Sequence, residues 1–161
     1  MKNNILKSTI LIFVLLIQIF FNEYFVILGI KPDLILITLL IMALYAQPIF
    51  LLLMAFILGL MQDWFMLTPL IGLSPLLKTI FAYIIIKFTQ NFRLYPNIFL
   101  FTINILLILL YFILYNWISL STSRLSFTEI LIQNSLPEFL YTGVLFIIFN
   151  FLILYYNKNR E

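Results

Sequence analysis

The stretch AFILGLMQDWFMLTPLIGL, residues 55–73, places a carboxylate, Asp63, inside a run that otherwise suits lipid. A carboxylate at membrane depth is costly, so it usually faces a protein interior or a polar cavity. Ala55, Gly59 and Asp63 are spaced four residues apart and therefore share one helix face. Small residues at this spacing let another backbone approach closely. The pattern predicts a tight helix contact that ends at a buried acid.

Lys78 is the natural partner for this acid. Ser74-Pro75 is typical of a helix start, with a capping residue followed by proline in the first turn, so Lys78 lies near the same end of its helix. Asp63 and Lys78 then have similar depths on consecutive helices, and we expect a salt bridge between them. In an alternative interpretation Asp63 carries a proton or an ion.

The residue types leave little room for catalysis. The chain has no Cys and no His, which excludes thiol chemistry, imidazole bases and the usual zinc and haem ligands. Ser74 and Lys78 could form a Ser–Lys pair, but a capped helix start explains them better. We expect no catalytic residue, no metal site and no cofactor.

Other polar residues have structural explanations. Asp33 follows Pro32 and is well placed to cap the helix that begins there. Asn104 and Asn150 need hydrogen-bond partners in lipid, and neighbouring antiparallel helices could be joined through them.

The composition identifies the class of protein. Of the 161 residues 65% are hydrophobic and 9% are charged, and the mean hydropathy is +1.17. A soluble chain this short could not hide so much apolar surface. The net charge of +3 is scattered and makes no nucleic-acid-binding face. We expect an all-α integral membrane protein.

The apolar runs divide into six expected transmembrane helices within one domain, residues 1–161. The second is short, and Pro48 in the sequence AQP separates it from the third. A five-span arrangement in which residues 25–48 are partly re-entrant is the alternative. The six expected spans cover about residues 6–22, 33–46, 49–65, 75–90, 97–117 and 136–156.

Basic residues predict the orientation. Of the nine Lys and Arg residues, two lie on the expected outer side, Lys31 and Arg124, six lie on the other, and Lys78 is left unassigned. The positive-inside rule then places both termini in the cytoplasm. The six inner residues are Lys2, Lys7, Lys87, Arg93, Lys158 and Arg160.

The longest polar stretch, residues 119–129, precedes the last expected span. Its end, SFTE, matches a capping box in which Ser126 and Glu129 satisfy each other's backbone N–H groups. We expect a short helix on the outer leaflet, followed by a separate last span that starts at Pro137.

Three motifs in order resemble the MreD family of the bacterial rod-shape machinery. They are KPDLILI at 31–37, LLLMAFILGLMQDWF at 51–65 with Gly59 and Asp63, and TPLIGL at 68–73 with Pro69 and Gly72. The last has one residue more than the family's SPLG turn. Lys78 has no clear counterpart in the family pattern.

The resemblance implies a non-enzymatic subunit of the elongasome, in the bacterial cytoplasmic membrane. Such a protein binds an MreC-like membrane protein and, with MreB, RodA and the penicillin-binding transpeptidase, supports lateral peptidoglycan synthesis. It also implies a fold similar to the substrate-binding subunits of energy-coupling-factor transporters. The alternative function is therefore capture of a vitamin-type molecule. Candidate residues to line such a pocket are few: Glu23, Asp63, Lys78 and Gln133.

Overall fold

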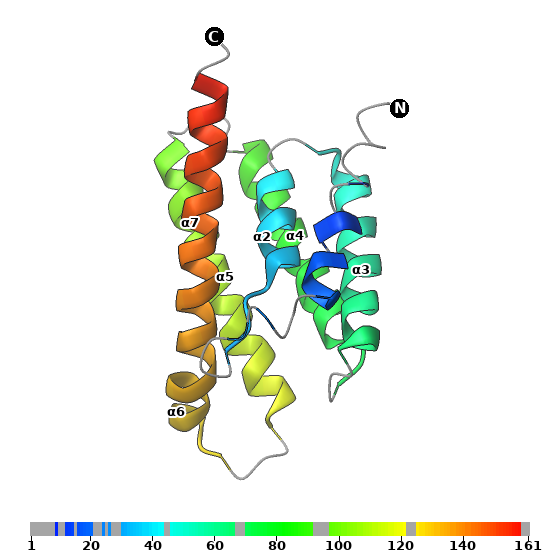
Figure 1. The fold of residues 1–161 in the computed structure, drawn as a ribbon, viewed down its shortest axis with the longest axis vertical. Helices are drawn as coiled ribbons and strands as arrows, with labels where there is room; N and C mark the ends of the chain where they lie inside the picture. The colour runs from blue at the N-terminus through cyan, green and yellow to red at the C-terminus, as the bar shows by residue number, and fades with distance from the viewer. Residues whose placement is uncertain are drawn as a thin grey trace.

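The computed structural model is a bundle of helices (Figure 1). Three of the helices in the described part of the chain are long and apolar enough to cross a membrane. They cover Pro48–Phe65, Phe99–Ser119 and Phe127–Leu152. The structure describes residues 9, 12–14, 16–20, 24, 26, 30–43, 46–66, 70–91, 97–121 and 125–158.

The second expected span is a short helix, α2 (Leu34–Met42), that begins part-way along the bundle (Figure 1). Asp33 caps it as expected, because its side chain accepts a hydrogen bond from the Leu36 N–H at 2.8 Å. Nine residues rise about 14 Å, which is less than half of the roughly 30 Å hydrocarbon core. Residues 31–33 precede α2 without helical structure. The α2 helix by itself is therefore too short to cross the hydrocarbon core.

The next two helices, α3 (Pro48–Phe65) and α4 (Leu73–Asn91), form an antiparallel hairpin (Figure 1). Gln47, directly before Pro48, has an extended backbone, because a residue preceding proline avoids helical angles. Pro48 then occupies the first turn of α3, as the sequence predicts. The α4 helix begins at Leu73, two residues earlier than expected.

The last helices, α5 (Asn97–Ser119) and α7 (Leu136–Lys158), are antiparallel neighbours (Figure 1). The capping box forms: the Ser126 N–H donates to Glu129 Oε2 at 2.8 Å, and the Glu129 N–H donates to Ser126 Oγ at 3.4 Å. It starts helix α6 (Phe127–Ile130).

The expectation of a separate helix before Pro137 is wrong. The α6 helix continues through a π-helical turn, η1 (Leu131–Ser135), directly into α7. Proline lacks an N–H for the carbonyl four residues earlier, and its ring crowds that carbonyl. A wider turn relieves this crowding without ending the helix.

The core lies where α2 meets α3, α4, α5 and α7. Every residue from Ile35 to Leu40 except Thr38 is buried there. The outward faces are apolar as well: Leu53 on α3 and Val144 on α7 are exposed. A helix that is apolar on all sides suits lipid on one side and protein on the other.

Two of the basic residues used to predict the orientation, Arg93 and Arg124, lie outside the described residues.

Candidate functional site

Lys78 forms the ion pair at the centre of the bundle, and its partner is Asp33. Lys78 Nζ lies 2.6 Å from Asp33 Oδ2, and both residues are buried. The same ammonium donates to Gln62 Oε1 and lies 5.8 Å from the centre of the Tyr111 ring. The expected pair between Asp63 and Lys78 is therefore wrong. A lysine in the second turn of α4 reaches across the bundle to the cap of α2 instead.

Asp33 connects this ion pair to three further elements. Its carboxylate caps α2 through Oδ1 and accepts a hydrogen bond from the Tyr111 hydroxyl at 3.2 Å through Oδ2. Its backbone N–H donates to Thr142 Oγ1 of α7, also at 3.2 Å. Asp33, Gln62, Lys78, Tyr111 and Thr142 form what we call the central polar cluster, which joins α2, α3, α4, α5 and α7.

Asp63 has a different role from the one expected, although it is fully buried. Its Oδ2 accepts hydrogen bonds from the N–H groups of Gly72 at 2.8 Å and Ser74 at 3.2 Å. These are unpaired donors at the start of α4, where a negative charge is also favoured by the helix dipole. Asp63 therefore caps the next helix in the chain. Its Oδ1 has no hydrogen-bond partner among the described residues.

The turn between the two helices depends on Gly72. Its φ of 102° lies in the left-handed region that glycine adopts most easily. This conformation brings its N–H to Asp63. Pro69, the other candidate residue of the TPLIGL motif, lies outside the described residues.

The small-residue face of α3 packs directly on α4. Ala55 is fully buried, and a Cβ built on Gly59 would lie 2.5 Å from Pro75 Cα and 2.7 Å from Pro75 N. No side chain fits in that space. The face formed by Ala55, Gly59 and Asp63 is thus covered by the chain itself. The backbone of α4 lies against Gly59, and the start of α4 lies against Asp63.

Asn104 and Asn150 were expected to join neighbouring helices. For Asn104, the side-chain carbonyl does not make such a link to a described residue. Asn104 is buried, but its Oδ1 has no hydrogen-bond partner among the described residues. Asn150 on α7 is half-buried. Instead, Asn116 on α5 donates to Glu138 Oε2 on α7 at 2.6 Å. This link was not predicted, because only Asn104 and Asn150 were considered as the amides that join helices, and Asn116, near the end of its expected span, was not.

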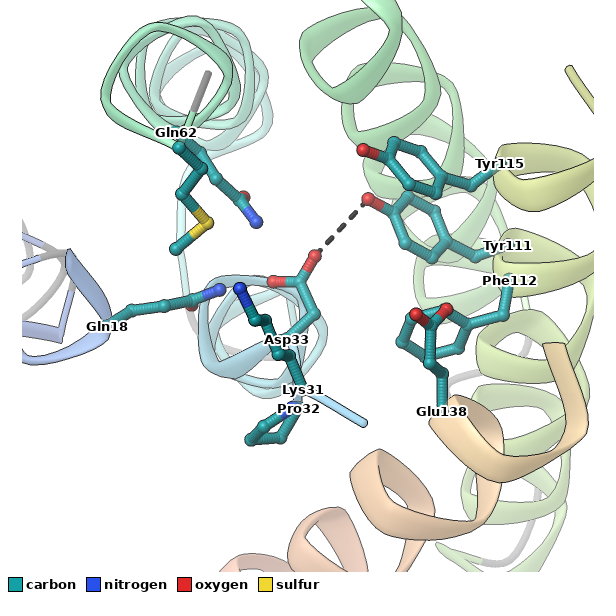
Figure 2. A pocket seen from close by; sticks show the side chains of 10 residues that line it. Gln18, Lys31, Pro32, Asp33, Gln62, Tyr111, Phe112, Tyr115 and Glu138 are labelled. Atoms are coloured by element: carbon teal, nitrogen blue, oxygen red, sulfur yellow. Dashed lines mark hydrogen bonds between the residues drawn. The ribbon is translucent and has the colours of Figure 1, made fainter. Parts of the chain in front are cut away.

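A partly open cavity of about 200 Å³ lies beside the central polar cluster (Figure 2). Tyr111, Phe112 and Tyr115 form one wall, and Gln18 reaches it from the first helical segment. Lys31, Asp33, Gln62 and Glu138 supply the remaining polar groups. None of the described candidates for a lining residue, Asp63, Lys78 and Gln133, belongs to it. Gln18 and Gln62 could have been found as isolated amides in apolar runs.

The central polar cluster can hold helices together, and its ionised groups, Asp33 and Lys78, are already engaged in doing so. No group of three or more acidic side chains that could hold a metal ion occurs in the described part of the chain. Lys78 is paired to a carboxylate at 2.6 Å, so its ammonium is occupied by protein groups rather than open to a substrate. The geometry of these residues is that of structural ion pairing and helix capping.

Changing Asp63 tests the capping role. Asp63→Ala removes the acceptor for two backbone N–H groups in a buried place, and we expect a loss of about 1–3 kcal/mol in the free energy of unfolding. Asp63→Asn keeps an acceptor oxygen and should lose less than half as much. Thermal unfolding of the purified protein in mild detergent measures both. A need for the charge itself would instead make the two variants equally unstable.

The comparisons with known proteins agree with the motifs described above. No curated protein and no solved structure gives a significant match. The model of the rod shape-determining protein MreD family matches residues 2–159. Because that match spans almost the whole chain, the protein belongs to the MreD family.

Proposed function

We propose that this protein is a non-enzymatic subunit of the machinery that sets rod shape. Its family is that of a rod shape-determining protein. It resides in the bacterial cytoplasmic membrane as one domain, residues 1–161, with six spans and both termini in the cytoplasm. It binds an MreC-like membrane protein there. Through that contact it supports the assembly of MreB, RodA and the penicillin-binding transpeptidase in lateral peptidoglycan synthesis.

The observation that carries this proposal is the use of the buried charges. Asp33, Lys78 and Asp63 are 5%, 1% and 0% exposed, and each is held by contacts between helices. An enzyme needs a base or nucleophile that faces a substrate, and a carrier needs an ionisable group with access to both sides. Charges that only join helices favour a scaffold over either of these.

The partner surface must then lie on the outward faces. Ala55, Gly59 and Lys78 are enclosed by the chain itself, so we propose a structural role for them. On α3 and on residues 136–152 of α7, the exposed side chains are apolar, with Phe56 and Ile147 among them. A partner's transmembrane helix would meet these faces through van der Waals packing rather than through buried charges.

Depletion of the protein in its native rod-shaped bacterium tests the role. We expect the cells to become round, and we expect an MreC-like protein to co-purify with the tagged protein from detergent extracts. Re-expression of the wild-type chain is the control and should restore rods. Depleted cells that keep their shape but require an added vitamin would contradict the proposal and favour transport.

Substrate capture is the second candidate, and the cavity is the observation in its favour. Its volume of about 200 Å³ is below the roughly 300–1,000 Å³ typical of pockets for drug-sized ligands. A vitamin would not fit without rearrangement of the bundle. This difference in volume favours the scaffold role over capture of a vitamin.

A further inference from the structure

The cavity described above has hydrogen-bond donors that the described part of the chain does not use. Gln18 Oε1 accepts from the Ile35 N–H at 3.0 Å, and Gln62 Oε1 accepts from Lys78 Nζ. With both oxygens occupied, the amide NH₂ groups of these glutamines are left as the free ends. Both residues line the cavity, and Figure 2 shows their side chains directed into it. Neither NH₂ group donates to a described residue.

Lys31 adds a positive charge to these donors. Its side chain lines the cavity and is exposed, and it forms no ion pair with a described residue. In Figure 2 the ends of Lys31 and Gln18 point toward one another. Two groups that can only donate do not satisfy each other. An acceptor, best an anionic one, would satisfy both.

A carboxyl group faces the same cavity from the opposite side. Glu138 lines it next to Phe112 (Figure 2), and its Oε2 is held by Asn116. The other lining acid, Asp33, is neutralised by Lys78. Glu138 lies in the first turn of α7, which follows η1 directly. The aromatic rings of Phe112 and Tyr115 beside Glu138 also suit a cation.

The geometry points to a binding site for a small zwitterion, with its anionic group on Lys31, Gln18 and Gln62 and its ammonium on Glu138. The cavity separates the ammonium of Lys31, which has no ion-pair partner among the described residues, from the carboxyl group of Glu138, so a singly charged ligand would satisfy only half of it. A primary ammonium a few bonds from a phosphate or carboxylate matches both the charges and the volume of about 200 Å³. Two sources supply this chemistry: the phosphoethanolamine headgroup of a lipid and a free amino acid.

Binding to the purified full-length protein tests the site. For the lipid source, nanodiscs containing phosphatidylethanolamine and phosphatidylglycerol in equal amounts are analysed by native mass spectrometry for retained lipid. For the soluble source, glycine and β-alanine are titrated by calorimetry, with ethanolamine and glycerol phosphate as singly charged probes. We expect one zwitterion class to bind at least ten-fold more tightly than the singly charged molecules. Binding of phosphatidylethanolamine would identify a lipid headgroup as the source, and binding of glycine or β-alanine would identify a free amino acid.

Variants separate this site from general lipid contact. Glu138→Gln and Lys31→Gln should each weaken binding by ten-fold or more. The matched controls Glu129→Gln and Lys87→Gln change exposed residues outside the cavity and should leave binding unchanged. Lys31 is exposed, so its variant reports on binding even if Glu138→Gln unfolds.

Three results would overturn the inference: no binding of either zwitterion, equal binding of singly charged probes, or full binding by both cavity variants. Each leaves the proposed role in cell shape untouched, because that role does not require a ligand.

Discussion

Lys78→Met is expected to destabilise the protein by about 3–5 kcal/mol, the usual cost of removing one partner from a buried ion pair. The loss leaves Asp33 as a buried charge with one neutral partner, Tyr111, and its own helix cap. It also leaves Gln62 without its donor. Thermal unfolding in detergent and accumulation in the membrane fraction measure the effect.

A double variant identifies the cause. Asp33→Asn combined with Lys78→Met removes both charges and keeps the cap of α2, because asparagine is among the best capping residues. We expect the double variant to regain at least half of the lost stability. Lys87→Met is the matched control: this exposed lysine of α4 lies 5.7 Å from the centre of the Tyr83 ring. It should cost no more than about 1 kcal/mol. A double variant no more stable than Lys78→Met would contradict pairing as the reason.

Gly59→Ala is expected to be strongly destabilising although it adds one methyl group. The new Cβ would lie 2.5 Å from the Cα of Pro75, a backbone atom that cannot turn away as a side chain would. The helices α3 and α4 must then separate, and overpacking of this kind costs about 1–3 kcal/mol or more. Separation would also pull the start of α4 away from Asp63. Lower thermal stability and reduced membrane accumulation are the measurements.

Gly143→Ala is the control for this substitution, because it makes the same change inside another helix. There the nearest atom to a new Cβ is Phe139 Cε2 at 3.8 Å, an ordinary contact. Alanine is favoured over glycine in a helix by about 1 kcal/mol, so this variant should be as stable as the wild type or more stable. Equal loss at both glycines would show that close packing at Gly59 is not responsible.

Local patterns in the sequence predicted much of the secondary structure. Pro48 starts α3, Asp33 caps α2, and Ser126 and Glu129 form their capping box, because each depends on contacts within a few residues. The spacing of Ala55, Gly59 and Asp63 correctly indicated a tight buried face. The π turn before Pro137 was missed, since a proline can end a helix or be accommodated within it.

The partners of the buried charges could not be predicted from the sequence. Periodicity shows which residues share a helix face, but it does not show which other helix covers that face. Lys78 was assigned to Asp63 because both lie near the ends of consecutive helices. Its true partner, Asp33, is presented by a half-length helix whose position the sequence left open.

By itself, the sequence determined the class of protein and the faces of its helices, since these follow from composition and from short-range spacing. Its ordered motifs resembled those of the family to which it belongs. Only the tertiary structure decided which carboxylate neutralises Lys78, what Asp63 caps and which polar groups surround the cavity. The physical reason is that a buried charge needs partners within a few ångströms. In this protein they come from segments far apart along the chain, as with Asp33 and Tyr111.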